Sequence, residues 1–565
     1  MATGTWRQSA RSSAERPLPR PKARQRTEEE VPEKEMSRRS FVSRAAAVAA
    51  TAAAGEALAA SAQPPQEPGP LRRAMDRAAR CCIAWLDPAN GYRPTGGYEP
   101  AHDTGRWWDA MLRYEAATGV RVPPTVESAM MDNLRALTDN PAALLASDLC
   151  NPHNLRESLL AYTALARWRS SEWAVRQGRT LVRAIAELLD PDGQMRYAEL
   201  AKRIGKPLTD DPLMVHRSPA GAWYSATGST GRAIEGLVLF HEVSGDAEAL
   251  RLAKRLAEAH VRHVLDPSGK VRRELLAPDH VGHTHSYLGT LRGVLLLGIK
   301  TGEKRYVKAV ATTYREGLWG TSVSYSGWTP HDQGRTRFPD DQGDPLGEHA
   351  SCGDVAQLAL WLGLDSRQTE LLDDAERLVR ARLLPSQMAD PSNPRNDGAW
   401  GAYAHGFERG SIIDVIAAVL HTLCDVQERA VAVPSRGAVT VHLNLSVDAR
   451  EVQVRSERGA EAALRVTLSR PRALRIRVPG WAPRSSVRLR AGDRALPVRW
   501  SGGYVTVDRG AVVPGVPVVL THALPECETQ EELPVSRRRF RLRWRGDDVV
   551  GCDPPVPIYL PAQAR

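Results

Sequence analysis

Residues 283–302 read HTHSYLGTLRGVLLLGIKTG, and the architecture follows from this stretch. A polar loop with two histidines runs straight into an apolar segment, which stops at Thr301-Gly302. Glycine at that point favours the left-handed conformation that ends a helix. An amphipathic segment follows at residues 304–316. An apolar helix, a glycine stop and an amphipathic helix together make one hairpin of a helical repeat.

The same unit recurs from residue 71 to about residue 430. Segments 110–119 and 236–245 are also apolar and end in Thr-Gly or Ser-Gly. Six polar helix entries are spaced by 51 to 70 residues, which is the length of one hairpin: His102-Asp103, Asn151-Pro152-His153-Asn154, Trp223-Tyr224, His283-Thr284-His285, Glu348-His349 and His405. We predict that the apolar helices form the inside of an (α/α)6 barrel, with all six entries at one end. An open helical solenoid is the alternative.

After Val431 the hydrophobic period changes from 3.6 to two residues. Residues 439–447, 464–468 and 474–478 alternate between apolar and polar side chains, and glycine and proline turns separate such segments. The fold class is therefore mainly α with a β domain, an (α/α)6 barrel followed by a C-terminal β-sandwich. We expect the barrel at residues 71–430 and the sandwich, with a C-terminal tail, at residues 431–565.

The N-terminus has the pattern of an export signal. Residues 1–35 are rich in Arg, Glu and Pro and are predicted to be disordered. Arg38-Arg39, an alanine-rich run and the small-residue site Ala60-Ser61-Ala62 follow Met36, an order typical of a twin-arginine signal. A membrane anchor is the alternative, but the run is short and contains Glu56. We expect a signal within residues 1–62, a linker at 63–70, export by the twin-arginine translocation machinery, and a periplasmic or extracellular protein; translation from Met36 stays open.

The composition argues against nucleic acid as a partner. The net charge is +10 in 565 residues, and the basic side chains form no stripe with interleaved aromatic residues. Seven cysteines occur, without C-x-x-C spacing, so export permits disulfides but the sequence does not require them.

The helix entries supply candidate substrate-binding residues. Unpaired N–H groups at helix starts bind polar ligands, histidine can hydrogen-bond sugar hydroxyls, and aromatic faces can stack on sugar rings. The candidates are His102, Asp103, Trp107, His153, Trp223, Tyr224, His283, His285, His331, His349 and His405. The alternative is that these side chains only cap helices and fill the barrel mouth.

Carboxylates near these entries supply candidates for acid/base catalysis. The loop at residues 327–354 is the densest polar stretch and contains Asp332, Glu348 and Asp354, and Glu408 lies at the sixth entry. A Ser/His/Asp triad stays open, although the chain has no G-x-S-x-G motif.

Several motifs, in this order along the chain, resemble the β-L-arabinofuranosidase family, glycoside hydrolase family 127. They are His283-Thr284-His285-Ser286, Gly327-Trp328-Thr329-Pro330, Ala350-Ser351-Cys352-Gly353, Arg477-Val478-Pro479-Gly480-Trp481-Ala482, Gly502-Gly503-Tyr504-Val505 and the stretch 543–551. The resemblance covers most of the chain after the signal. It implies a barrel with a β-sandwich, and exo-acting, retaining hydrolysis of furanosides or related plant or bacterial glycans.

The resemblance breaks at the family's reactive centre. In that family a cysteine thiolate attacks the sugar while bound to zinc through a Glu-x-Cys motif and a later Cys-Cys pair. Here Cys352 matches the first cysteine, but Ala350 takes the place of the glutamate and residues 407–412 contain no cysteine. Because zinc prefers four ligands, we expect the zinc-cysteine mechanism to be lost and no cofactor, with Cys352 the only matching zinc ligand.

The sequence leaves the activity open between three classes. The first is a glycoside hydrolase that uses Asp332, Glu348, Asp354, Glu408 or Cys352 and acts on an oligo- or polysaccharide. The second is a non-catalytic glycan-binding protein, and the third is a uronic-acid lyase or epimerase on the same barrel. The oligomeric state is not predicted.

Overall fold

The structure is a computed structural model that describes residues 68–209, 229–272, 281–334, 336, 339–404 and 412–555. The predicted export signal lies outside these residues. All seven cysteines lie within them, and each is a free thiol. Among the helices described, none is both long and apolar enough to cross a membrane.

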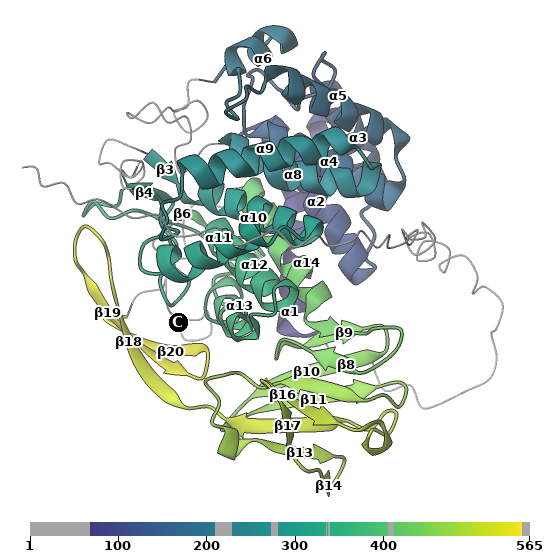
Figure 1. Cartoon of the computed structure of the whole chain (residues 1–565), viewed down its shortest axis with the longest axis vertical. Helices are drawn as coiled ribbons and strands as arrows, with labels where there is room; N and C mark the ends of the chain where they lie inside the picture. Colours follow the sequence, from purple (N-terminus) through teal and green to yellow (C-terminus); the bar gives the residue numbers. More distant parts are fainter. Residues whose placement is uncertain are drawn as a thin grey trace, which may run out of the picture. The chain divides into compact units, whose positions relative to one another are not determined.

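Six helices pack side by side in a closed ring (Figure 1). They are α2 (Pro100–Thr118), α4 (Asn154–Arg169), α8 (Ser229–Ser244), α10 (Thr284–Thr301), α12 (His349–Asp365) and α14 (Ile413–Arg429). Each contacts the next in chain order, and α14 contacts α2. This last contact closes the ring, so the predicted (α/α)6 barrel is confirmed and an open solenoid is excluded.

A second set of helices lies outside the ring, each packed on one or two inner helices. They are α1 (Pro70–Ala84), α3 (Pro124–Leu137), α5 (Glu172–Leu188), α9 (Ala247–His263), α11 (Lys304–Thr312) and α13 (Leu372–Leu378); α6 (Tyr197–Ile204) follows α5, and α11 and α13 continue as π-helical turns at Thr313–Leu318 and Val379–Leu383.

Burial separates the two sets as the hydrophobic patterns predict. In α10 every residue from Thr284 to Gly298 is buried, because helices flank it on several sides. In the outer helix α11 only Tyr306 and Val310 are buried. The glycine stops behave as expected, since Gly119 and Gly302 take left-handed conformations with φ of 75° and 73°.

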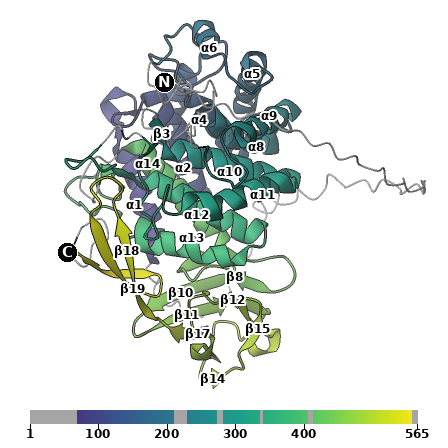
Figure 2. The same cartoon turned by 60° about the vertical axis from the view of Figure 1, so that its left-hand side comes forward.

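The C-terminal strands form two facing sheets beyond α14 (Figure 2). One sheet has the order β14-β13-β17-β11-β10-β9 and the other β15-β16-β12-β8-β7. Their bounds are β7 Val431–Ala432, β8 Val439–Val441, β9 Val447–Ala449, β10 Val452–Arg458, β11 Glu461–Leu468, β12 Leu474–Arg477, β13 Arg488–Ala491, β14 Arg494–Ala495, β15 Arg499–Ser501, β16 Tyr504–Val507 and β17 Val518–Ala523. Strand β11 alternates buried and partly exposed residues, as its period-two pattern predicts.

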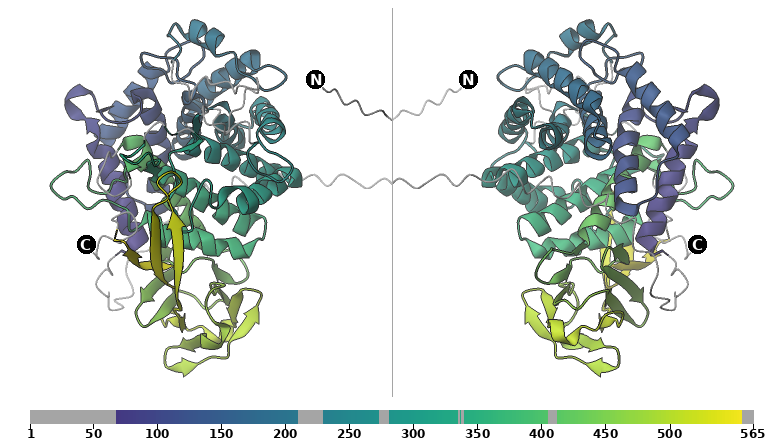
Figure 3. Two further views of the ribbon diagram at one scale, coloured as in Figure 1. Left: turned by 90° about the vertical axis from the view of Figure 1, so that its left-hand side faces the viewer. Right: turned by 90° about the vertical axis from the view of Figure 1, so that its right-hand side faces the viewer.

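The last three strands differ from the expectation of a single sandwich with a tail. β18 (Glu526–Glu532), β19 (Arg539–Arg545) and β20 (Asp548–Asp553) form a separate antiparallel sheet. In both views of Figure 3 this sheet lies beside the barrel helices. Phe540, Leu542 and Trp544 pack there with Trp328 and Ala381 of the barrel domain. The predicted strand 439–447 is divided into β8 and β9, which belong to different sheets, because alternation carries no information about the surface a strand packs on.

Buried ion pairs join the sandwich to the barrel. Arg477 of β12 contacts Glu376 and Asp373 of α13, and its side chain is 3% exposed. Glu376 also accepts a hydrogen bond from the backbone N–H of Asn444 at 3.0 Å. Burial raises the pKa of Glu376, but Arg477 and its neighbouring arginines outweigh burial and lower it.

Candidate active site at the barrel mouth

Three helix entries carry polar side chains that do not cap their own helices. His153, His283 and Glu348 occupy the N-cap positions of α4, α10 and α12, and none of them accepts a capping hydrogen bond from the backbone of its helix. In contrast, Glu99 caps α2 by accepting a hydrogen bond from the backbone N–H of His102 at 3.0 Å. The three N-cap side chains therefore face one another across the ring, and helix capping does not explain them.

Four histidines form a row across this end of the barrel. The ring centroids lie 5.6 Å apart for His102 and His153, 6.2 Å for His153 and His283, and 4.6 Å for His283 and His331. All four side chains are buried. Burial, with nearby arginines, lowers the pKa of His102 and His153, although Glu157 opposes this shift at His102. A neutral imidazole can donate one hydrogen bond and accept another, which suits sugar hydroxyls.

The strand pairs near the helix entries hold the neighbouring loops in place. β3 (Val281–His283) pairs with β4 (Asp332–Gly334), which sets His283 opposite Asp332. β5 (Gly347–Glu348) pairs with β6 (Ala402–Ala404). Nδ1 of His331 lies 2.9 Å from Oδ1 of Asp332. Loops that are distant in sequence thus bring His283, His331, Asp332 and Glu348 together.

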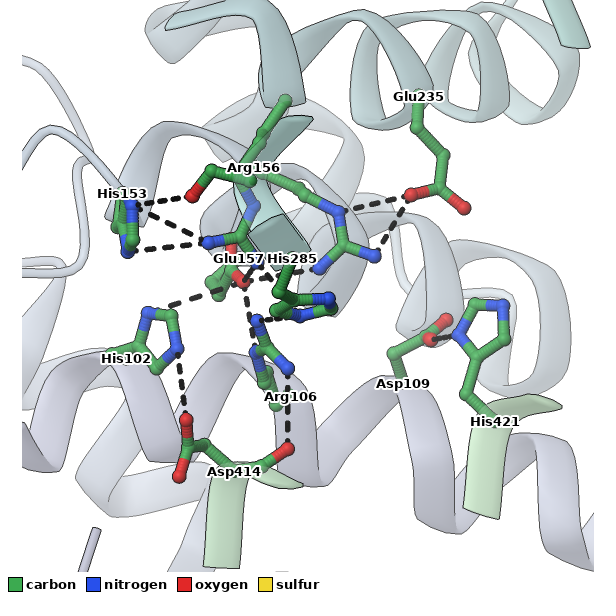
Figure 4. A network of polar contacts seen from close by, with 12 residues as sticks. His102, Arg106, Asp109, His153, Arg156, Glu157, Glu235, His285, Asp414 and His421 are labelled. Atoms are coloured by element: carbon green, nitrogen blue, oxygen red, sulfur yellow. Dashed lines mark hydrogen bonds and ion pairs between the residues drawn. The ribbon is translucent and has the colours of Figure 1, made fainter. Parts of the chain in front are cut away.

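Buried arginines and carboxylates fill the barrel next to the histidines (Figure 4). This set, the ionic network, consists of Arg106, Arg156, Arg232, Arg292, Glu157, Glu235 and Asp354. Nε of Arg106 lies 3.0 Å from Oε1 of Glu157, and the same oxygen accepts hydrogen bonds from Arg156 and Arg232, each at 3.1 Å. Burial raises the pKa of Glu157, but the arginines outweigh burial and hold it below the usual range.

The ionic network fixes the orientation and proton of His285. An arginine only donates hydrogen bonds, so Nε2 of His285, 2.8 Å from the guanidinium of Arg106, must accept. The proton then sits on Nδ1, which lies 2.5 Å from Oδ2 of Asp354. The other oxygen of Asp354 accepts a hydrogen bond from Arg292 at 2.6 Å. Both oxygens of Asp354 are engaged, so its contacts make it an orienting partner of His285.

Carboxyl groups in different environments lie at the mouth. Asp414, in the first turn of α14, has Oδ2 3.8 Å from Nε2 of His102. Burial raises the pKa of Asp414 to about 6, with Arg106 opposing the shift and the charge of Glu348 adding to it. Burial raises the pKa of Glu348 as well, but its contact with His283 and the neighbouring histidines bring the pKa well below the ordinary value. The two environments favour a protonated Asp414 and an ionised Glu348.

Asp103 is a third buried carboxyl at the mouth. Burial and the charge of Asp414 raise its pKa well above the ordinary value. Gly97 packs so closely on Asp103 that a Cβ at position 97 would lie 2.0 Å from its carboxylate. A side chain at position 97 therefore requires the carboxylate of Asp103 to move.

A cavity of about 700 Å³ lies between the loop that contains Trp328, Pro330 and Asp332 and the sheet β18-β19-β20. Trp319, Tyr325 and Trp328 line it, together with Glu531 of β18. Asp332 also lines it and contacts His331 of the histidine row. The cavity therefore begins at the candidate site.

Three predicted site residues have surroundings that separate them from the mouth. Cys352 is fully buried, and a Cβ at Gly327 would lie 3.2 Å from its sulfur. Burial raises the pKa of the Cys352 thiol to about 12. Trp107 packs edge to face on Trp108 in the core. Nδ1 of His349 lies 2.7 Å from the carbonyl oxygen of Gly401, so His349 anchors that loop.

Some predicted site residues are not described by the structure, and some site residues that it does describe were not predicted. The predicted Trp223, Tyr224, His405 and Glu408 lie outside the described residues. The sequence analysis missed Asp414 and the arginines and glutamates of the ionic network. One signal was present, since Arg232 and Glu235 stand three residues apart in an otherwise apolar helix.

The chain matches no family model and no curated protein sequence. Solved structures do match. The β-L-arabinofuranosidase of family GH127 from Geobacillus stearothermophilus T6 is 15% identical, with a TM-score of 0.53, and the match covers 86% of this chain and 81% of that one. A second GH127 β-arabinofuranosidase is 12% identical with a TM-score of 0.55, covering 85% and 80% of the two chains.

A third solved structure, described as a glycoside hydrolase, is 13% identical with a TM-score of 0.55, covering 86% of this chain and 81% of its own. Identities this low establish the fold and leave the reaction to be argued from the site. The chain thus has the barrel-and-sandwich fold of the solved family GH127 structures.

Proposed function

We propose that the barrel mouth is the active site of a glycoside hydrolase. The observation that carries the proposal is the pair Asp414 and Glu348, two buried carboxyl groups with opposite preferences for a proton, beside a row of buried histidines. Most glycoside hydrolases use one carboxylic acid and one carboxylate to cleave the glycosidic bond.

Asp414 is the proposed proton donor. With a pKa near 6, it keeps a proton at mildly acidic pH and can deliver that proton to the oxygen of the departing sugar. Glu348 carries the negative charge that stabilises the positive charge developing on the sugar ring, and it takes the proton of the water molecule that bonds to the anomeric carbon. His102, His153 and His285 hold the hydroxyl groups, and the ionic network keeps His285 in one orientation.

The fold supports a furanoside as the first substrate class to test. Two of the solved structures with this fold are arabinofuranosidases of family GH127. The aromatic cavity beside Asp332 offers flat faces for further sugar units, so an oligo- or polysaccharide is the proposed partner.

We propose that the zinc-thiolate mechanism is absent. Without a metal ion, burial raises the pKa of the Cys352 thiol to about 12, and a protonated thiol is a poor nucleophile. The position of Cys352, packed under Gly327 in the core, supports the same conclusion.

The proposed setting is the periplasm or the extracellular space, reached by twin-arginine export. The support is the twin-arginine order of residues 36–62. Fusion of residues 36–62 to a reporter should direct the reporter out of the cytoplasm, and changing Arg38 and Arg39 to Lys should retain it inside.

The activity is tested with a panel of aryl furanosides and pyranosides. Asp414→Asn should lower kcat/KM by about 10²–10⁴ for nitrophenyl substrates. The loss should be much smaller for a dinitrophenyl substrate, since that leaving group departs without a proton. Asp508→Asn is the matched control, because its side chain is 75% exposed in the sandwich.

Three outcomes count against the proposal. Binding of a glycan without turnover of any substrate indicates a glycan-binding protein. A rise in ultraviolet absorbance from an unsaturated product indicates a lyase. Equal losses for both leaving groups in Asp414→Asn remove Asp414 as the proton donor.

A further inference from the structure

His283, His331 and Glu348 place three metal-binding atoms close together. One ligand atom from each residue lies within 4.8 Å of the other two, and all three residues are buried. The closest described pair is Nε2 of His283 and Oε2 of Glu348, at 3.4 Å. Two ligands of a tetrahedral zinc ion, with bonds of about 2.0–2.2 Å, lie about 3.4 Å apart. The spacing of this pair thus equals one edge of such a site.

The outer nitrogens of both histidines already have partners. Nδ1 of His283 lies 2.9 Å from Oγ of Ser286, and Nδ1 of His331 lies 2.9 Å from Oδ1 of Asp332. A metal-binding histidine almost always uses one nitrogen for the metal and donates a hydrogen bond from the other. A carboxylate such as Asp332 is a frequent acceptor for it. For His283 this leaves Nε2, the atom that lies 3.4 Å from Oε2 of Glu348, as the atom for a ligand.

The Nε2 atom of His283 has no hydrogen bond within the described residues, although it is buried. A buried polar atom without a partner is costly, and native proteins satisfy nearly all of them. Glu348 is held in turn by Ser351, whose hydroxyl donates to Oε2 at 3.2 Å. The cluster has the supporting contacts of a metal site and one atom still to be satisfied.

We propose that His283, His331 and Glu348 bind a divalent transition-metal ion, with zinc the best fit, and leave at least one coordination position open. Two imidazoles and one carboxylate are a frequent ligand set for zinc with an open position. Magnesium and calcium prefer oxygen ligands and octahedral or larger shells, which this set does not supply.

The proposal goes beyond the proposed glycosidase activity and replaces the sequence-based expectation of no metal. That expectation considered the cysteine positions of the family, and none of the three residues here is a cysteine. With the ion bound, Glu348 is a ligand, so the role of free carboxylate given to Glu348 under the proposed function belongs to the metal-free protein. The open position then faces a water molecule or a sugar hydroxyl beside the histidine row.

The test measures metal binding and needs no glycan. The full chain, purified without a histidine tag and stripped with a chelator, is titrated with zinc chloride by calorimetry. We expect one ion per chain. His283→Gln and His331→Gln should each weaken binding by more than about 100-fold, and Asp332→Asn by about 10- to 100-fold, the range for loss of an outer-shell partner.

Cys352→Ser is the matched control, because Cys352 is also buried near the end of the same barrel but lies outside the cluster. It should leave zinc binding unchanged. Cobalt provides a second measurement on the unaltered protein, should a histidine variant fail to fold. The cobalt-loaded protein should show visible bands of a tetrahedral or five-coordinate ion without a thiolate-to-cobalt charge-transfer band.

Absence of stoichiometric zinc binding overturns the proposal, as does a thiolate-to-cobalt band or full loss of binding in Cys352→Ser. The two proposals fail separately. Hydrolysis by the stripped protein, with no zinc bound in the titration, leaves the glycosidase and removes the metal site. Zinc bound through the two histidines in a protein that hydrolyses no glycoside leaves the metal site and removes the glycosidase.

Discussion

Removal of the charge on Glu157 is the sharpest test of the ionic network. Glu157 is completely buried, and its Oε1 accepts hydrogen bonds from Arg106, Arg156 and Arg232. Glu157→Gln keeps the shape of the side chain but leaves three guanidinium groups around a neutral amide. Breaking a buried ion pair by removing one partner costs about 3–5 kcal/mol, because the remaining charge stays buried without compensation.

The expected cost converts to a shift in melting temperature. The folded unit, residues 67–565, has about 500 residues, and at about 2.1 cal/mol/K per residue its unfolding entropy is about 1 kcal/mol/K. Glu157→Gln should therefore lower Tm by about 3–5 °C in differential scanning calorimetry. Asp508→Asn removes an exposed ion pair with Arg499 and should shift Tm by less than about 1 °C.

A double variant separates the ionic contact from general disturbance of the core. If Arg232 and Glu157 interact as described, Arg232→Gln should cost much less in the Glu157→Gln background than alone. A Tm of Glu157→Gln within about 1 °C of the unaltered protein would refute the reasoning. Strictly additive effects of the two changes would refute it too.

Three further predictions concern the close packing at Gly97, the acid stability of the barrel and the contact with the sandwich. Gly97→Ala should destabilise the protein by about 1–3 kcal/mol in chemical unfolding, because the new methyl group meets a buried carboxylate, whereas Gly459→Ala, with open space around it, should be neutral. Burial lowers the pKa of His260 to about 3, below its unfolded value of about 6.5, so it contributes stability above about pH 6.5 that is lost as the pH falls toward 3. His260→Leu should spare about 1.4 kcal/mol of the loss in unfolding free energy between about pH 7.5 and about pH 5.5, and an equal loss in both proteins would contradict this. Arg477→Met strands two carboxylates of α13 and should lower Tm by about 3–5 °C, with a smaller loss for Arg477→Lys; an unchanged Tm in both would show that the contact contributes nothing.

The sequence predicts the barrel because burial follows local pattern. In α10 a mostly apolar stretch, interrupted by Thr290 and Arg292, is typical of an inner helix, and a glycine such as Gly302 ends it by its own conformation. The histidine entries were found for the same reason, since they stand at recognisable helix starts. The location of the β18-β19-β20 sheet was not found, because alternation reveals a strand but not the surface that covers it.

The site was predicted less completely because its contacts join distant segments. An arginine such as Arg106 is expected at the surface from sequence alone. Its buried position is explained only by its ion pair with Glu157, which lies 51 residues away in the sequence. Asp414 lies at a helix start that contains no histidine. The search for regularly spaced histidine-bearing helix starts therefore did not identify it. Cys352 was singled out by a motif, but a motif does not tell on which face of the helix the sulfur lies.

The buried charged contacts inside the barrel also have a consequence for how the chain folds. Repeat proteins with contacts only between neighbouring hairpins can lose or gain a repeat and still fold. Here Asp109 of the first inner helix contacts His421 of the last at 2.6 Å, across 312 positions of sequence. A fragment with three or four hairpins would expose arginines whose partners it lacks. The barrel is therefore a single cooperative unit, which cannot be shortened one hairpin at a time and must bring its two ends together before the interior charges are neutralised.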